Sequence, residues 1–328
     1  MTGISIEIHT ASFRTVRGYT VVGAILDELA FFPTDDAAEP DREILAAIRP
    51  AMATIPNAMM LCLSSPYARK GALYEAHKRH YGREGNSLVI QAATRALNPT
   101  VPREVIDRAY SEDEASARAE YGAEFRIDVE AFVSREALEA CVVPGRRELL
   151  RLPGERYTAF LDFEGGSGSD SATLAVAHEE RRAGQKLIVL DAVREVRPPF
   201  SPQQVCHDFA AVLQSYGATW ATADRYAGDF PVEGMLRYGV TLKPSNKTKS
   251  DIYKEFLPLL NSGGVELLDI PRLHSQIFGL ERRVARGGRD SIDHPRGGHD
   301  DLANAACGAV VTATAPAMFV REVEILWG

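Results

Sequence analysis

The second half of the chain alternates short apolar runs with polar turns, and this pattern predicts an α/β domain. The first three runs follow one another with only turns between them, which indicates an antiparallel meander, and helical spacing separates the later runs. One helix has clear end signals, with Ser201 as N-cap, Pro202 in the first turn and Gly217 after its end. The predicted strands are residues 157–163, 172–178, 187–196, 219–223, 240–243 and 265–268.

The first half contains two nearly continuous apolar runs, residues 20–26 and 58–63. Such runs are typical of parallel strands that are buried on both faces. Helical spacing lies between and after them, over residues 41–52, 71–80 and 111–121. We therefore predict a partial parallel α/β domain.

Turn residues separate this part from the second half. Pro144-Gly145 and Pro153-Gly154 are strong turn signals and indicate a linker. The predicted division is a first domain over residues 1–125, a linker over 126–155 and a second domain over 156–328.

Composition narrows the class of protein. The chain has 328 residues, 45% of them hydrophobic and 25% charged, as in ordinary globular proteins. No apolar run reaches the roughly 18 residues of a membrane span, and the N-terminus lacks a signal-peptide pattern. The four cysteines are far apart, which fits reduced thiols in a cytoplasmic protein without membrane contact. Because the net charge is −8, any DNA contact requires a local basic patch.

Acidic residues stand where separate elements end or begin. Asp162 ends the first strand of the second domain, Asp224 follows the fourth, and Asp300-Asp301 opens the last helix, which is expected to run to about Thr314. The predicted order is three antiparallel strands, then a helix, then a strand that carries an acid. This is the order of a ribonuclease H-like mixed sheet with flanking helices, in which strands one and four are neighbours. Converging carboxylates of this kind hold two Mg²⁺ or Mn²⁺ ions, about 4 Å apart, for phosphodiester hydrolysis.

Each acid also has a simpler interpretation. A lone Asp after a strand is commonly a turn residue, and two acids at a helix start can cap it. Asp170 is either an outer acid of the site or a turn residue, and His299 is either a proton-transfer group or structural. Either Asp300 or Asp301 is the direct metal ligand, although we expect both to face the metals.

The motifs in residues 157–314 resemble the C-terminal nuclease domain of the large terminase subunit of tailed bacteriophages. The resemblance implies that Asp162, Asp224 and one or both of Asp300 and Asp301 bind metal. It also implies cleavage of double-stranded DNA concatemers during genome packaging, with a small terminase subunit and a portal protein as partners, in a bacterial cell. The matching stretches are Phe160-Leu161-Asp162, Asp191 to Glu195, Ala223 to Gly228, Lys243 to Ser245, Lys247 to Ser250 and Gly298 to Ala305.

Basic residues close to these acids are candidates for DNA contact. One group precedes the last helix and the other follows residue 242. Arginines on an exposed hairpin are often merely solvated. Next to a phosphodiesterase site, however, they would bind backbone phosphates without recognising specific bases. The candidates are Arg282, Arg283, Arg286, Arg289, Lys243, Lys247 and Lys249.

The first half resembles part of a terminase motor. Val21 to Glu28 is similar to a Walker B strand, in which Asp27 would help to hold Mg²⁺ and Glu28 would orient water. Leu61 to Pro66 is similar to the coupling motif. No GxxxxGK[ST] P-loop occurs in the chain, so the ATP site is incomplete and we expect no ATP turnover from this chain alone.

The missing P-loop suggests an N-terminally truncated protein, a split gene product or a degenerate prophage copy, with ATP bound only in a complete motor. A rival hypothesis is a non-catalytic partner that contributes Asp27, Glu28 and an interaction surface to a motor on another polypeptide. A third is a different ribonuclease H-like nuclease, such as a resolvase or transposase. The motor-like half argues against the third.

Overall fold

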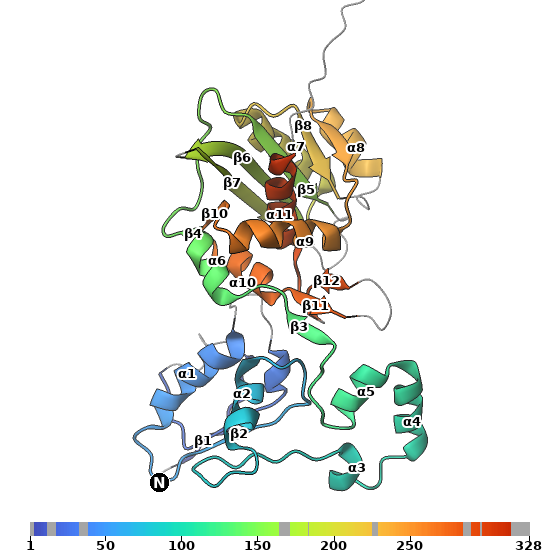
Figure 1. Cartoon of the computed structure of the whole chain (residues 1–328). Helices are drawn as coiled ribbons and strands as arrows, with labels where there is room; N and C mark the ends of the chain where they lie inside the picture. Colours follow the sequence, from blue (N-terminus) through green and yellow to red (C-terminus); the bar gives the residue numbers. More distant parts are fainter. Residues whose placement is uncertain are drawn as a thin grey trace, which may run out of the picture. The chain divides into compact units, whose positions relative to one another are not determined.

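A computed structural model describes residues 3–11, 18–32, 39–163, 171–182, 184–224, 229–284, 290–295 and 297–315 (Figure 1). The chain forms two compact units. The first comprises Met1–Ser134 with Pro271–Asp300, and the second comprises Arg135–Ile270 with Asp301–Gly328.

A seven-stranded mixed sheet forms the centre of the second unit, in the order β4-β10-β7-β6-β5-β8-β9. β5, β6 and β7 form the predicted antiparallel meander. β8 pairs parallel to β5, so the first and fourth predicted strands are neighbours, as expected. The strands are β4 (Val142–Val143), β5 (Tyr157–Asp162), β6 (Ala172–Arg182), β7 (Gln185–Val196), β8 (Trp220–Ala223), β9 (Thr241–Pro244) and β10 (Val265–Leu268).

Two helices of this unit begin at a side chain that accepts from a free backbone N–H group. Ser201 caps the predicted helix, since its Oγ accepts from the backbone N of Gln204 at 3.5 Å. Thr248 does the same for the next long helix, accepting from the backbone N of Asp251 at 3.2 Å. The helices are α6 (Arg135–Cys141), α7 (Pro202–Ser215), α8 (Asp229–Leu236), α9 (Lys249–Asn261) and α11 (Asp301–Thr314).

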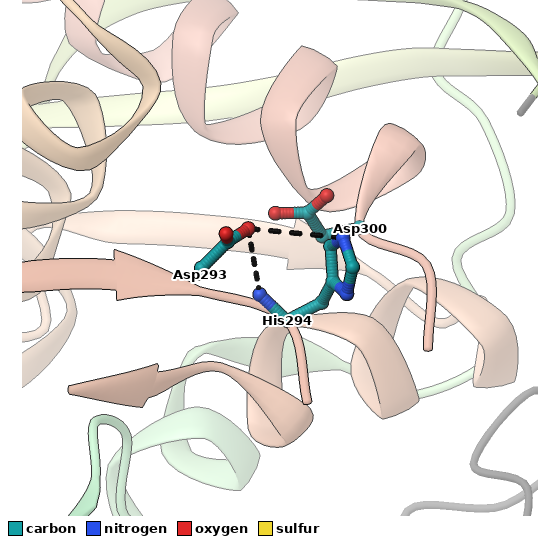
Figure 2. Close-up of side chains that lie close together, drawn as sticks. All are labelled: Asp293, His294 and Asp300. Atoms are coloured by element: carbon teal, nitrogen blue, oxygen red, sulfur yellow. Dashed lines mark hydrogen bonds and ion pairs between the residues drawn. The ribbon is translucent and has the colours of Figure 1, made fainter. Parts of the chain in front are cut away.

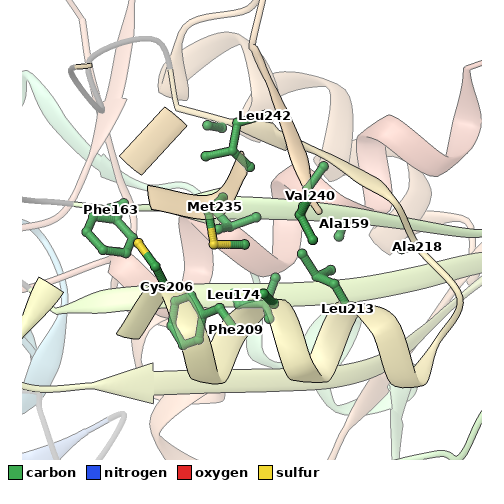
Figure 3. Packing of buried hydrophobic residues seen from close by; sticks show 14 of the residues in the cluster. Ala159, Phe163, Leu174, Cys206, Phe209, Leu213, Ala218, Met235, Val240 and Leu242 are labelled. Atoms are coloured by element: carbon green, nitrogen blue, oxygen red, sulfur yellow. The ribbon is translucent and has the colours of Figure 1, made fainter. Parts of the chain in front are cut away.

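Alternate residues of β5 face opposite sides of the sheet. Ala159 lies in an apolar core with Phe209 and Leu213 of α7 (Figure 3). Leu161 belongs to the same core. Phe160 points the other way, towards α11, which lies across β5, β6 and β7 (Figure 1).

The approach between α11 and β5 is close because Gly308 has no side chain. A Cβ at this position would lie 2.4 Å from the Phe160 ring. The glycine therefore allows α11 to pack directly on the sheet, and this packing fixes the height of the helix above the strand that ends in Asp162.

The first unit contains a two-stranded parallel sheet, β1-β2, and a three-stranded antiparallel sheet, β12-β11-β3. A small core of Leu26, Leu29, Ile44, Leu45 and Ile48 lies between β1 and the first helix. The elements are β1 (Gly23–Leu26), η1 (Leu29–Phe31), α1 (Pro40–Met52), β2 (Met59–Cys62), α2 (Gly71–His80), α3 (Thr94–Leu97), α4 (Arg103–Glu112), α5 (Glu114–Glu120), β3 (Val129–Ala131), α10 (Pro271–Gly279), β11 (Glu281–Arg283) and β12 (Ser291–Asp293).

The prediction that the strands of the first half are buried on both faces is wrong. Ile25 is 71% exposed and Met59 is 61% exposed, because α1 covers only the face of the two-stranded sheet that carries Leu26. The single helix predicted over residues 111–121 is also wrong. Asp113 has extended backbone there, and its side chain accepts from the backbone N of Ser116, so one helix ends and another begins.

Segments far apart in sequence build the first unit. β3, which lies in the predicted linker, pairs with β11 in an antiparallel ladder. Glu281 of β11 is fully buried and accepts a hydrogen bond from the Tyr67 hydroxyl at 2.7 Å. Residues 271–300 therefore group with residues 1–134, whereas the sequence pattern assigned them to the second domain.

Within the described ranges, the helices are all too short or too polar to cross a membrane.

Candidate metal centre

Two of the predicted acids meet at the rim of the central sheet. Asp162 is the last residue of β5 and Asp224 directly follows β8, its parallel neighbour. The backbone N of Asp224 donates to the carbonyl oxygen of Leu161 at 2.9 Å, which continues the ladder to this point. Because both strands end here in the same direction, their carboxylates lie together.

Asn304, in the first turn of α11, joins the two acids. Its Nδ2 donates to Asp162 Oδ2 at 2.7 Å and to Asp224 Oδ2 at 3.1 Å. The side chain is 1% exposed. Sequence reasoning overlooked this residue; the available signal was its spacing, three positions after Asp301, which places both on one side of a helix.

Asp301 is the first residue of α11 and is 8% exposed. Its Oδ2 accepts from the backbone N of Ser171 at 2.9 Å, and its carbonyl oxygen accepts from the Thr173 hydroxyl at 2.9 Å. The Ser171 hydroxyl in turn donates to Glu195 Oε1 at 3.1 Å. These bonds attach the start of α11 to β6 and bring a further acid, Glu195, close to Asp301.

Asp300 belongs to a different group of side chains, in the first unit. It is 3% exposed, and one ligand atom from each of Asp293, His294 and Asp300 lies within 4.8 Å of the others (Figure 2). His294 Nδ1 lies 2.8 Å from the carbonyl oxygen of Pro295, which can only accept, so Nδ1 carries the proton. In the neutral ring, Nε2 then keeps a lone pair, and a mixed nitrogen and oxygen set suits Mn²⁺, Co²⁺ or Zn²⁺ better than Mg²⁺.

The donor set at the sheet rim fits a divalent cation. Two carboxylate oxygens lie within hydrogen-bond distance of the same Asn304 nitrogen, so they are close enough to approach one ion. The Asn304 Oδ1 is buried and accepts no hydrogen bond from any residue that the structure describes. Carboxylate and amide oxygens are the ligands that Mg²⁺ and Mn²⁺ prefer, so Asp162 and Asp224 are the residues that would hold such an ion.

The Walker B-like acids follow β1. The backbone N of Leu63 donates to the Leu26 carbonyl at 2.8 Å, which sets the ends of β1 and β2 side by side. The backbone N of Ala30 donates to the Ser64 hydroxyl at 3.1 Å. Glu28 has a left-handed backbone, with φ of 54°, and Asp27 precedes it. This arrangement connects the two motor-like motifs, while their use with ATP stays a prediction.

The basic candidates are spread over both units. Arg282 Nε donates to Asp290 Oδ2 at 2.8 Å, and Arg283 donates to the His294 carbonyl at 2.8 Å. Arg286 and Arg289 lie outside the described residues.

The lysine candidates belong to the second unit. The Lys243 ammonium lies 4.7 Å from the centre of the Trp220 ring, and Lys247 pairs with Glu255. Lys249 is the first residue of α9. A DNA contact at any of these arginines or lysines stays a prediction.

No protein-family model matches the chain, and no curated protein matches it. Solved structures of phage large terminases are similar to it. The large terminase nuclease from thermophilic phage G20c is 15% identical, with an alignment that covers 53% of this chain and 94% of that one at a TM-score of 0.45. The large terminase of HK97 bacteriophage is 17% identical over 90% of this chain and 71% of its own, also at 0.45.

A third similar structure is a large terminase from another thermophilic bacteriophage, in complex with ADP. It is 12% identical over 93% of this chain and 72% of its own, at a TM-score of 0.43. The G20c nuclease has been solved with bound magnesium, cobalt and zinc.

Proposed function

We propose that this chain is a metal-dependent DNA endonuclease of the large-terminase type, which cuts double-stranded DNA concatemers during genome packaging. The observation that carries the proposal is the meeting of Asp162 and Asp224 at neighbouring strand ends, bridged by one buried amide. The strand order β7-β6-β5-β8-β9, with an antiparallel meander followed by parallel strands, supports a ribonuclease H-like assignment.

Asp162 and Asp224 would be the principal ligands of two Mg²⁺ or Mn²⁺ ions, with Asp301 as a further acid of the site. A metal-binding role for Asp300 stays a prediction. Bound ions of this kind lower the pKa of water and neutralise charge on the attacking and leaving oxygens. The contribution of the chain is to hold its carboxylates on rigid strand ends, so that little reorganisation accompanies the reaction. His299, next to the acids in sequence, is proposed as a proton-transfer group.

DNA would be held by contacts to its phosphates. The chain has a net charge of −8, so binding would depend on the local arginines and lysines named above and would weaken with salt. Contacts to phosphates carry little sequence information, which agrees with cleavage of low sequence preference. In the packaging assembly we propose a small terminase subunit and a portal protein as partners, inside a bacterial host cell.

A second candidate function is that of a partner in a split motor. The exposed apolar face of β1-β2, with Ile25, Met59 and Leu61, supports it, because an apolar sheet face of this kind is normally covered by another element. In this role Asp27 and Glu28 would complete an ATP site whose P-loop lies on another polypeptide.

Cleavage of supercoiled plasmid in Mg²⁺ or Mn²⁺ tests the nuclease proposal. Asp224→Asn removes one charge from the site without changing the side-chain size, and we expect at least a hundredfold loss of nicking, on the order of the loss of one preorganised charged group. Asp208→Asn is the matched control, since Asp208 is exposed on α7, on the face of the sheet opposite α11. Equal nicking by wild type and Asp224→Asn would refute the site.

A further inference from the structure

The amide of Asn304 occupies an unusual position between two acids. It is buried in the first turn of α11, and its single Nδ2 group donates to one oxygen of Asp162 and one of Asp224. Two carboxylates at this separation repel each other, and an N–H donor to each of them reduces that repulsion. In this arrangement, the amide therefore supplies the positive partner that both acids require.

The other end of the amide has no such partner. Asn304 Oδ1 is buried, and no donor among the described residues reaches it. An unsatisfied buried acceptor is unfavourable, so no hydrogen bond from the described residues to Oδ1 holds the amide in the orientation that points Nδ2 at the acids. Because an amide has nearly the same shape on its oxygen and nitrogen sides, half a turn about the last side-chain bond exchanges the two atoms in place.

The helix that carries Asn304 is fixed on both sides of this residue, so the amide can rotate without a movement of the backbone. The first residue of its helix is bonded to β6 through Ser171 and Thr173. Further along, Gly308 lets the helix lie directly on the Phe160 ring. A rotation of the amide would therefore change what Asn304 offers to the acids without moving the helix.

We propose that Asn304 is a ligand of the divalent cation held by Asp162 and Asp224, and that its amide reverses when the cation binds. Without the cation, Nδ2 faces the acids. With the cation present, the positive N–H₂ group is repelled and Oδ1 turns towards the ion, which prefers a carbonyl oxygen. This inference rests on the proposed cation site of Asp162 and Asp224.

Because the Asn304 side chain is uncharged, it limits the affinity of the site for the divalent cation. Two carboxylates balance the charge of one divalent ion, and an amide adds a ligand without adding charge. An aspartate at this position would add a negative charge, which strengthens binding of the ion and makes the ion-free state less stable. Asn304 would thus keep the ion exchangeable.

Resonances of the Asn304 side-chain N–H₂ group in the wild-type 328-residue chain test the proposal. In a titration with Mg²⁺, the two proton signals are expected to shift strongly, because they leave the carboxylates. Asn304→Asp identifies these signals by their loss. Signals that stay in place while Mg²⁺ binds would overturn the proposal.

Calorimetric titration of Mg²⁺ gives a second measurement. Asn304→Asp is expected to tighten binding about tenfold, as an added charged ligand does, and Asn304→Leu to weaken it. Asn261→Asp, the same change at an exposed position of α9, should leave affinity unchanged. Equal affinities for wild type and Asn304→Asp would contradict the ligand role. If wild type binds no Mg²⁺ or Mn²⁺ at all, the proposed cation site fails and the role of Asn304 fails with it.

Discussion

At the residue scale, the role of each acid becomes evident only from the side chains that lie beside it. Asp162 and Asp224 each look like a turn residue in the sequence, yet strand pairing sets them side by side with Asn304 between them. Their convergence could be predicted, because an acid at the end of each of two parallel neighbours must lie at one rim. The role of Asn304 was missed, because its one signal is a spacing of three residues from Asp301 in a helix that is otherwise apolar.

The sequence also gave no sign that Asp300 and Asp301 belong to different groups of side chains. Adjacent residues at a helix start point in different directions, and the helix boundary falls between these two. Asp301 bonds to Ser171 in the second unit, whereas Asp300 groups with Asp293 and His294 in the first. The pairing of β12 with β11 places Asp293 and so determines that second group.

A buried ion pair in the central sheet gives a prediction of pH dependence. His178 Nδ1 lies 2.7 Å from Asp191 Oδ2, and both side chains are 1% exposed. Burial lowers the pKa of His178, but the hydrogen bond and the charge of Asp191 outweigh burial and raise that pKa above its ordinary value of about 6.5. Burial also raises the pKa of Asp191, so the proton that the pair shares is held tightly.

The raised pKa of His178 means that the folded protein keeps a proton that the unfolded chain releases above about pH 6.5. The stability from this proton is fully present below that pH and is lost as pH rises through the folded pKa, with a slope of up to about 1.4 kcal/mol per pH unit. Urea unfolding from pH 5 to 9 measures it. Asp191→Asn should remove this slope, while Asp208→Asn, next to the exposed His207, should keep it. The same slope in both variants would contradict the assignment.

At the element scale, the sequence pattern predicted the strands of the second unit well. Each strand is short, apolar and bounded by turn residues, and neighbouring strands in the meander are close in sequence. The first unit was predicted less well, since β1 and β2 are apolar enough for burial but have one exposed face. The hydrophobic pattern reports only what a strand can bury, and the elements that cover it lie elsewhere in the chain.

The β1-β2 pair also carries a prediction about ATP. The pair sets Asp27 and Glu28 beside the Ser64 turn, but the chain has no P-loop to bind the phosphates. Phosphate release from Mg²⁺-ATP by the purified chain should therefore equal the blank and should not change in Glu28→Gln. Turnover that Glu28→Gln abolishes would contradict this prediction. Turnover that appears only after a P-loop polypeptide is added would favour the split motor.

At the scale of the whole molecule, the path of the chain alternates between the two units. Residues 271–300 return to the first unit through the pairing of β11 with β3 before α11 joins the second. The sequence could not reveal this path, because ladders between distant segments leave no local signal. The central sheet, the acids at its rim and the motor-like strands nevertheless followed from pattern and order.

The proposed nuclease function and the proposed role of Asn304 both require that Asp162 and Asp224 bind a divalent ion between them. Anomalous diffraction from crystals of the wild-type chain soaked in Mn²⁺ tests this requirement, since the method locates the ion without reference to activity. We predict a Mn²⁺ peak between the two carboxylates, with Asn304 Oδ1 as a further ligand, and its loss in Asp224→Asn. A fully occupied Mn²⁺ site elsewhere, with no peak between Asp162 and Asp224, would contradict the account.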